Sequence, residues 1–231
     1  MSVEIIGIAG LPEVGPGDDL GGLICQRAEL EDGDVVVVTQ KVVSKAEGRV
    51  VPIDTDDPRG HKALVERESV RVLRRRGDLI ISETQHGFVC ANAGVDLSNV
   101  AEGHAALLPR DPDRTARRIR DRIRAGAGVD VAVIVSDTFG RPWRCGVTDV
   151  AIGSAGISPI LDLRGTTDAL GRELEVTEVA IVDEIAAAAD LVMGKARNVP
   201  VAVVRGVDRA WFGEGTVRSG LVRHPSEDLF R

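Results

Sequence analysis

The sequence predicts a mixed α/β fold, and three patterns support this prediction. Runs rich in valine and isoleucine, bounded by glycine, aspartate or proline, recur along the chain and are typical of strands. Segments with helical periodicity alternate with these runs, which indicates an α/β or α+β chain. Residues 89–108 and 150–175 are rich in small and polar residues without helical periodicity, so we expect long loops and hairpins there.

Strands are expected wherever the β-branched runs occur. They cover residues 3–10, 34–44, 78–83, 129–136, 173–182 and 200–206. No repeat, low-complexity tract or obvious linker interrupts the order. A chain of 231 residues can bury a sizeable core. We therefore expect one domain over residues 1–231, built either as one unit or as two intimate subdomains.

Helices are expected over residues 18–30, 59–76, 112–127 and 182–196. Two of them carry start signals. Asp18 or Asp19 can cap the first after a Pro-Gly pair, and Pro112 follows Asp111 at a first-turn position. Arginines in residues 114–124 alternate at helical spacing with Ile119 and Ile123, which favours a solvated helix face.

Composition excludes several classes of function. The net charge is -7 and the aromatic content is 3% with no tyrosine, which argues against a nucleic-acid partner. The three cysteines form no CxxC pair, which suits a reducing compartment. No signal peptide is evident and no apolar run approaches the ~20 residues that span a bilayer. We expect a cytoplasmic protein without a membrane partner.

Two aspartates are the best candidates for a metal site. Asp96 and Asp137 each follow an apolar or small-residue stretch and precede hydroxyl or amide side chains, such as Asn99 and Thr138. Carboxylate and hydroxyl oxygens suit Mg²⁺ or Mn²⁺. Each aspartate could instead be a capping or turn residue. Arg141 and Arg144 follow the second aspartate, where guanidinium groups could neutralise it or hold a phosphate or substrate carboxylate.

Other motifs carry weaker signals. There is no P-loop, and the GPGDDLGG segment reads as a turn before a capped helix. Lys41 and Lys45 follow the end of an apolar strand. They could bind phosphates there, or they could be the charged residues of a solvent-exposed hairpin edge. The four histidines show no zinc-binding pattern. We expect His86 and His104 at the surface and Cys145 as a packing residue.

Five separated stretches carry a resemblance to a known family. They are GIAGLPEVGPGDDL, DVVVVTQKVVSKAEGR, ANAGVDLSNV, SDTFGRPWRCGVTDVAIGSAG and GRELEVTEVAIVDEIAAAADLVMGKA. In this order and spacing they resemble the coenzyme F420-0:L-glutamate ligase family, also called F420:gamma-glutamyl ligases. The resemblance covers about nine tenths of the chain, from the first strand to Gly206. Residues 204–215 match the family poorly. Trp211 and Phe212 in this stretch could line a ligand, but the favoured interpretation is that they cover the core.

The resemblance implies a GTP-dependent ligase of coenzyme F420 biosynthesis. Such an enzyme joins the lactyl carboxylate of coenzyme F420-0 to the amine of L-glutamate through an acyl phosphate, and can add further gamma-linked glutamates. It implies a homodimer with a mixed α/β fold of its own, in which sheets and hairpins form a cleft. The implied ions are Mg²⁺ or Mn²⁺, as a pair, with K⁺ as a further candidate. No C-terminal nitroreductase-like domain, found in some members, is expected here.

The family's site residues carry over by position. Metal ligands correspond to Asp96, Asp137 and Thr138. Nucleotide contacts correspond to Gly10, Leu11, Pro12, Gln40, Lys45 and Asn99, and to Gly194 and Lys195 within residues 193–200. Lys195 departs from members that carry an acidic or amide residue at the metal site, so the metal shell is one ligand short or is completed by water. Arg141 and Arg144 are the candidate catalytic residues, receiving the phosphoryl group or an anionic substrate.

Two other readings of the same residues stay open. A metal-dependent phosphohydrolase or phosphotransferase could use the same carboxylates and would release phosphate without glutamate. A ligand-binding module would show no turnover. Fold alone does not separate these classes, because one fold can carry many activities.

Overall fold

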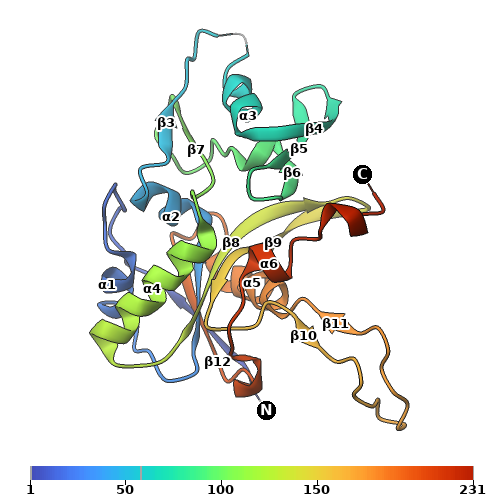
Figure 1. Ribbon diagram of the computed structural model, residues 1–231. Helices are drawn as coiled ribbons and strands as arrows, with labels where there is room; N and C mark the ends of the chain where they lie inside the picture. Colours follow the sequence, from blue (N-terminus) through green and yellow to red (C-terminus); the bar gives the residue numbers. More distant parts are fainter. Residues whose placement is uncertain (1, 58, 231) are drawn as a thin grey trace.

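The structure, a computed structural model, describes residues 2–57 and 59–230. A five-stranded sheet in the order β1-β12-β2-β8-β9 lies at its centre (Figure 1). Its strands are β1 (Glu4–Ile8), β12 (Val201–Arg205), β2 (Val35–Thr39), β8 (Ala132–Arg141) and β9 (Arg144–Ala155). Only the β2–β8 pair of this sheet is parallel. The four valines of β2 are fully buried, as expected of a strand covered on both faces.

Helices cover this sheet. In Figure 1, α4 (Pro112–Ala127) lies in front of the sheet and α5 (Ile181–Met193) behind it. α4 packs on β8 and β9 and carries α1 (Leu20–Cys25) on its flank. Ile119 and Ile123 of α4 are buried while most of its arginines are exposed, which confirms the predicted solvated face. Trp211 and Phe212 pack partly buried against the same core, as expected.

A smaller unit lies above the central sheet in Figure 1. It contains the sheet β4-β5-β6 (Ser69–Arg76, Leu79–Thr84, Val89–Ala91), the pair β3 (Val50–Pro52) and β7 (His104–Ala106), α3 (Lys62–Glu68) and η1 (Asn92–Gly94). It has its own apolar cluster, centred on Val65, Ile80 and Leu107. Two cavities lie between this unit and the β8–β9 hairpin, and residues of both line them.

The remaining elements are short. The pair β10 (Leu161–Asp162) and β11 (Glu178–Val179) starts an arm that projects from the body (Figure 1). η2 (Arg209–Trp211), α6 (Val217–Gly220) and η3 (Pro225–Glu227) complete the C-terminal segment, and α2 (Gln40–Ala46) follows β2 directly. Within the described residues, 2–57 and 59–230, none of the helices combines the length and apolar character needed to cross a bilayer.

Both predicted helix starts are confirmed. Asp19 caps α1 by accepting a hydrogen bond from the Gly22 amide, and Asp111 caps α4 by accepting one from the Arg114 amide. Pro112 occupies the first turn of α4. Each capping hydrogen bond joins residues only three apart in sequence, so it can be predicted without knowledge of the tertiary contacts.

Several predicted elements are wrong in part. The strand expected over 34–44 ends at Thr39, where its parallel pairing with β8 also ends, and α2 takes the rest. The helix expected over 59–76 stops at Glu68, because Ser69–Arg76 pairs with β5 as β4. The strand expected over 173–182 is reduced to β11, and α5 begins at Ile181. The loop expected over 150–175 begins later than predicted, because residues 150–155 belong to β9, which pairs with β8.

Candidate active site

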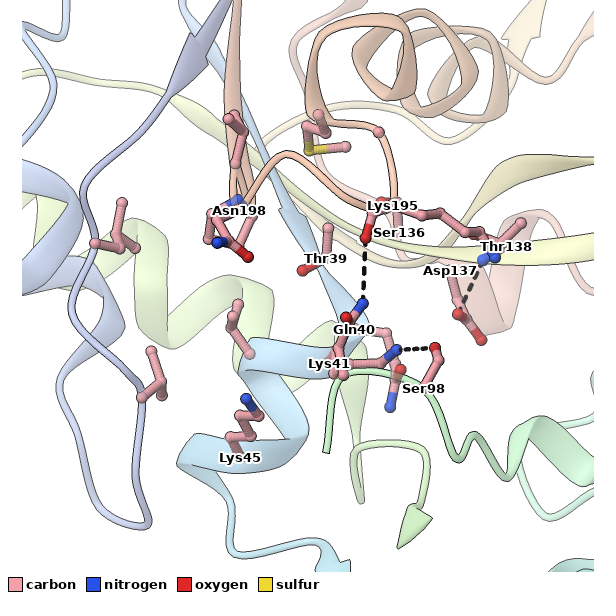
Figure 2. Close-up of a pocket in the computed structure, with 18 of the residues that line it drawn as sticks. Thr39, Gln40, Lys41, Lys45, Ser98, Ser136, Asp137, Thr138, Lys195 and Asn198 are labelled. Atoms are coloured by element: carbon pink, nitrogen blue, oxygen red, sulfur yellow. Dashed lines mark hydrogen bonds between the residues drawn. The ribbon is translucent and has the colours of Figure 1, made fainter. Parts of the chain in front are cut away.

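Five separated segments converge on one cavity of about 320 Å³ beyond the end of β2 (Figure 2). They are the 11–14 turn, α2, the 96–99 loop, the β8–β9 hairpin and the end of α5 with the segment after it. The sheet and α2 thus gather segments from both ends of the sequence. Gly10 is not part of the lining. The lining contains the carry-over residues Leu11, Pro12, Gln40, Lys45, Asp96, Asn99, Asp137, Thr138, Gly194 and Lys195.

Asp137 is half-buried in the wall of the cavity. It sits inside β8, opposite Val150 of β9, and the Thr138 amide donates a hydrogen bond of 2.9 Å to its Oδ1. Burial raises the pKa of Asp137 to about 7, with the charges of Asp149 and Asp96 adding to the effect against the opposing Thr138 amide and Lys41. The Asp137 carboxyl therefore binds a proton near neutral pH unless a cation approaches it.

Asp96 has the opposite electrostatics. Its carboxylate accepts hydrogen bonds from the Ser98 amide at 2.7 Å and the Ser98 hydroxyl at 3.1 Å, and pairs with Lys41 Nζ at 2.8 Å. Partial burial alone would raise the pKa of Asp96, but the hydrogen bonds from Lys41 and Ser98 outweigh burial and lower it. In Figure 2 the Asp137 carboxylate points towards the segment that carries Ser98. The cavity thus places an ionised carboxylate near one that is readily protonated.

Asp149 is a third carboxylate, and the sequence analysis missed it. It lies on β9 directly opposite Thr138 and is only 4% exposed. It accepts a hydrogen bond of 2.6 Å from the Thr138 hydroxyl and one of 2.9 Å from the Ser136 hydroxyl. The Thr138 side chain is therefore held by Asp149 rather than by Asp137. The signal that could have found Asp149 is an aspartate inside the apolar run of residues 147–152.

A fourth carboxylate, Asp190 of α5, also lines the cavity. Burial raises its pKa, reinforced by the charge of Asp149 and opposed by Lys195. The cavity wall therefore concentrates negative charge on the α5 side as well as on the side of the 96–99 loop. An anionic ligand can bind here only with cations in place.

The lysines of α2 supply part of that positive charge. Lys41 and Lys45 are one helical turn apart and both line the cavity, so they share a side through helical rather than extended geometry. Lys41 Nζ also donates to the Ser98 hydroxyl at 2.7 Å, and Lys45 pairs with Glu13. Lys195 lines the opposite wall, and its carbonyl accepts a hydrogen bond of 3.3 Å from Asn99 Nδ2.

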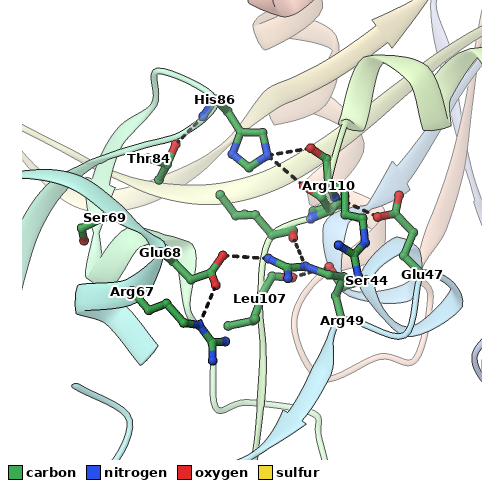
Figure 3. Close-up of polar contacts among 12 residues, drawn as sticks. Ser44, Glu47, Arg49, Arg67, Glu68, Ser69, Thr84, His86, Leu107 and Arg110 are labelled. Carbon is green, nitrogen blue, oxygen red and sulfur yellow. Dashed lines mark hydrogen bonds and ion pairs between the residues drawn. The ribbon is translucent and has the colours of Figure 1, made fainter. Parts of the chain in front are cut away.

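A polar network fixes α2 against the smaller unit (Figure 3). Leu107 O accepts hydrogen bonds from the Ser44 hydroxyl at 2.6 Å and from Gln40 Nε2 at 3.0 Å. Arg49 pairs with Glu68 at 2.7 Å. Gln40 is 2% exposed, so its side-chain amide group anchors the start of α2 as well as lining the cavity. This anchoring sets where Lys41 and Lys45 point.

The two candidate catalytic arginines are not placed at the cavity. Arg141 and Arg144 lie at the exposed tip of the β8–β9 hairpin, and Arg141 Nη2 donates to Cys145 O at 2.7 Å. β8 continues as a strand past Asp137, so Arg141 lies about 13 Å further along it. Closeness in sequence did not give closeness in space here.

Two further expectations are wrong. His86 is buried, and its Nε2 contacts the carbonyl oxygens of Pro109 at 2.9 Å and Arg110 at 3.2 Å (Figure 3). Its ring also stacks on Phe88. Burial lowers the pKa of His86 and keeps it neutral. Cys145 is exposed rather than packed. His104 is half-buried and lines a neighbouring cavity.

The donor set suits a hard cation only with help from a ligand. Among residues 2–57 and 59–230, no three His, Cys, Asp or Glu side chains converge closely enough to hold a metal by themselves. Asp137 has no ion-pair partner among the described side chains, although Asp96 and Asp149 are close enough to raise its pKa. The Asp137 carboxyl is therefore an oxygen ligand that a cation can bind in place of its proton, which fits a hard ion such as Mg²⁺ or Mn²⁺.

A polar cavity at the end of a parallel strand pair, lined by four aspartates and three lysines, is typical of an α/β enzyme that handles a phosphate-bearing ligand. Comparison with known proteins agrees. The family model described as F420-0:Gamma-glutamyl ligase matches residues 9–206. The chain belongs to this family and is an enzyme of the ligase class.

Curated relatives match over nearly the whole chain. The chain is 44% identical to the coenzyme F420:L-glutamate ligase of Methanothermobacter thermautotrophicus, with all of both chains covered. It is 45% identical to the protein of that name from Methanopyrus kandleri, over 95% of this chain and 94% of the relative. It is 41% identical to that from Haloarcula marismortui, over 99% and 96%. The family resemblance seen in the sequence is thereby confirmed.

Proposed function

We propose that this chain is a GTP-dependent ligase that joins the lactyl carboxylate of coenzyme F420-0 to the amine of L-glutamate. The names of the relatives, which specify coenzyme F420 and L-glutamate, support this choice of substrates. The observation that carries the proposal is that Asp96, Asp137 and the two lysines of α2 line one cavity. That combination of charges suits a nucleoside triphosphate positioned for phosphoryl transfer.

The reaction requires activation because a carboxylate is a poor electrophile. A lactyl carboxylate oxygen attacks the γ-phosphorus of GTP, the bond to the β-phosphate breaks, and GDP leaves. The glutamate amine then attacks the acyl carbon, loses a proton and displaces inorganic phosphate, which forms the amide. Further gamma-linked glutamates are added by the same two steps. The protein's main task is to hold the reactants in line and to neutralise charge.

The residues of the cavity divide this task. Lys45 and Lys41 contact the phosphates once GTP displaces their present partners, Glu13 and Asp96. Asp96 and Asp137 would hold Mg²⁺ or Mn²⁺, as two ions. Bound divalent ions supply charge neutralisation of the phosphates in the transition state. Asp149 positions Thr138 and Ser136 through their hydroxyls, which keeps the hairpin wall of the cavity fixed.

The guanosine half of the nucleotide has room beside the phosphate cavity. A neighbouring cavity of about 630 Å³ shares Glu13, Val14, Lys45, Asn99 and Asn198 with the first. Gly48, Val100 and His104 line its far side. Lys45 therefore lies at the junction of the two cavities, where the triphosphate would be joined to the nucleoside.

Mass spectrometry of one reaction tests the proposal. The purified chain is incubated with coenzyme F420-0, GTP, Mn²⁺ and L-glutamate, and a product heavier by one glutamyl unit is expected. GDP and phosphate should form only when both acceptors are present. Phosphate released without glutamate would instead favour the phosphohydrolase alternative. Sedimentation velocity on the same sample tests the homodimer that the family resemblance implies.

A further inference from the structure

A second cavity, of about 870 Å³, lies between the β8–β9 hairpin, the β4-β5-β6 sheet and the C-terminal segment from α6 onward. Its wall is mainly apolar, with Val72, Phe88, Phe139 and Val150 among the lining residues. Phe88 and Phe139 meet edge to face at a centroid distance of 6.1 Å. A cavity of this size and character is in the range that holds a small organic ligand.

This apolar cavity begins beside Asp137, the candidate metal ligand. Phe139 follows Asp137 by two residues on β8, and β8 pairs regularly with β9 over residues 136–140. The two side chains therefore leave the same face of the strand, about 7 Å apart along it. Val150, which lines the apolar cavity, is the direct cross-strand partner of Asp137. A ligand lying on the apolar wall can thus reach Asp137 with one end.

The rim of the apolar cavity is suited to anions. Arg71, Arg74 and Arg223 line it, although the chain as a whole has a net charge of -7. Arg71 pairs with Glu83 only at 3.5 Å and is half exposed, and the hydrogen bond of Arg74 goes to the neighbouring Leu73 carbonyl. Guanidinium groups with exposed donors are well suited to phosphate and carboxylate groups. Asp183 and Asp228 also line the cavity, and Asp183 accepts a hydrogen bond from the Ala151 amide.

We propose that this second cavity binds the deazaflavin of the acceptor substrate. The planar ring lies on the apolar wall between Val72 and Phe139, its anionic groups pair with the rim arginines, and the lactyl carboxylate points to Asp137. The inference rests on the proposed function for the identity of the ligand. The match to the ligand comes from the second cavity's own residues: a planar aromatic ligand with anionic groups suits both the apolar wall and the arginine rim.

Direct binding tests this site without turnover. The deazaflavin is fluorescent, so its anisotropy reports binding to the full chain in the absence of GTP and glutamate. Val72 is 37% exposed on β4, so Val72→Trp fills the cavity with little change to the core. Val70, on the same strand and 68% exposed, does not line the cavity, and Val70→Trp is the matched control. We expect Val72→Trp to weaken binding at least tenfold and the control to change it less than twofold.

A second pair of variants tests the rim. Arg74→Ala removes one anion contact, and Arg117→Ala removes an exposed arginine of α4 as its control. Loss of a hydrogen bond to a charged group predicts about tenfold weaker deazaflavin binding for Arg74→Ala, while the KM for GTP stays unchanged. If Val72→Trp fails to fold, as seen by circular dichroism, the Arg74→Ala result decides alone.

Each outcome has a distinct meaning. Unchanged deazaflavin binding in both cavity variants, or no binding by the wild type, overturns this inference. Tight binding that is sensitive to both variants, together with no glutamyl product, supports the cavity but overturns the proposed ligase reaction. Weaker binding accompanied by a lower sedimentation coefficient would assign the cavity to contact with a second copy of the chain and would also overturn the inference.

Discussion

Replacing Asp137 by asparagine tests the electrostatics of the site most sharply. Burial raises the pKa of Asp137 from 3.8 to about 7. The folded chain therefore keeps a proton that the unfolded chain loses, and the free energy of unfolding falls as the pH rises from about 4 to about 7. Three pKa units correspond to about 4 kcal/mol. Since the side chain is half-buried beside an open cavity, solvent screening reduces this to about 2 kcal/mol.

Calorimetry with a chelator present checks this magnitude. Asp137→Asn keeps an oxygen that can accept the Thr138 amide hydrogen bond but has no charge to bury. Its Tm should exceed that of the wild type by about 4–8 °C at pH 8, and by less at pH 5. Added Mn²⁺ should raise the Tm of the wild type and reduce or reverse this difference. An identical pH dependence in both proteins, or an equal response of both to Mn²⁺, would refute the reasoning.

Three other substitutions have expected outcomes. Lys45→Met removes the proposed phosphate contact, while the folded protein loses only a surface ion pair with Glu13. Steady-state kinetics should therefore show at least a tenfold higher KM for GTP with little change in Tm. An unaltered KM would exclude this contact. Asp113→Ala leaves three backbone amides of β9 and α6 without their carboxylate acceptor. Urea unfolding should therefore show a free energy of unfolding lower by about 3–5 kcal/mol. A decrease below about 1 kcal/mol would contradict this role. In Asp149→Asn, the amide side chain cannot accept hydrogen bonds from both the Ser136 and the Thr138 hydroxyl as the carboxylate does. We expect kcat to fall about tenfold or more while the KM for glutamate changes little. Wild-type turnover would show that the hairpin wall needs no carboxylate.

The sequence predicted those parts of the fold that depend on local signals. The start of α4 follows from Asp111 and Pro112, whose capping role needs only a few neighbouring residues. The buried valines of β2 form an apolar run that only a strand covered on both faces requires. Asp96 and Asp137 also stand out in the sequence as candidate ligands, because each breaks an apolar or small-residue stretch with a carboxylate.

Elements decided by tertiary pairing were less predictable. β4 has a sequence that fits a helix, with charged residues at helical spacing, but the segment pairs with β5 over residues 69–76. α2 takes the second half of an apolar run that suggests one long strand, because Gln40 and Ser44 bind the Leu107 carbonyl from one helical face. Neither partner is near in sequence, so propensity alone could not find these contacts.

The candidate site was incomplete for a similar reason. Asp149 becomes part of it only through the β8–β9 register, which places it opposite Thr138. The same register carries Arg141 away from Asp137 to the exposed hairpin tip, although only four residues separate them. Without knowing that β8 continues past Asp137, the sequence favours a loop in which both arginines reach the carboxylate.

The most direct test of the account is a crystal of the chain grown with Mn²⁺ and a non-hydrolysable GTP analogue, measured at the manganese absorption edge. The account predicts anomalous density between Asp96 and Asp137, with the analogue's phosphates next to it and Lys45 in contact. Manganese found elsewhere, or an analogue bound without an ion between these two aspartates, would contradict it.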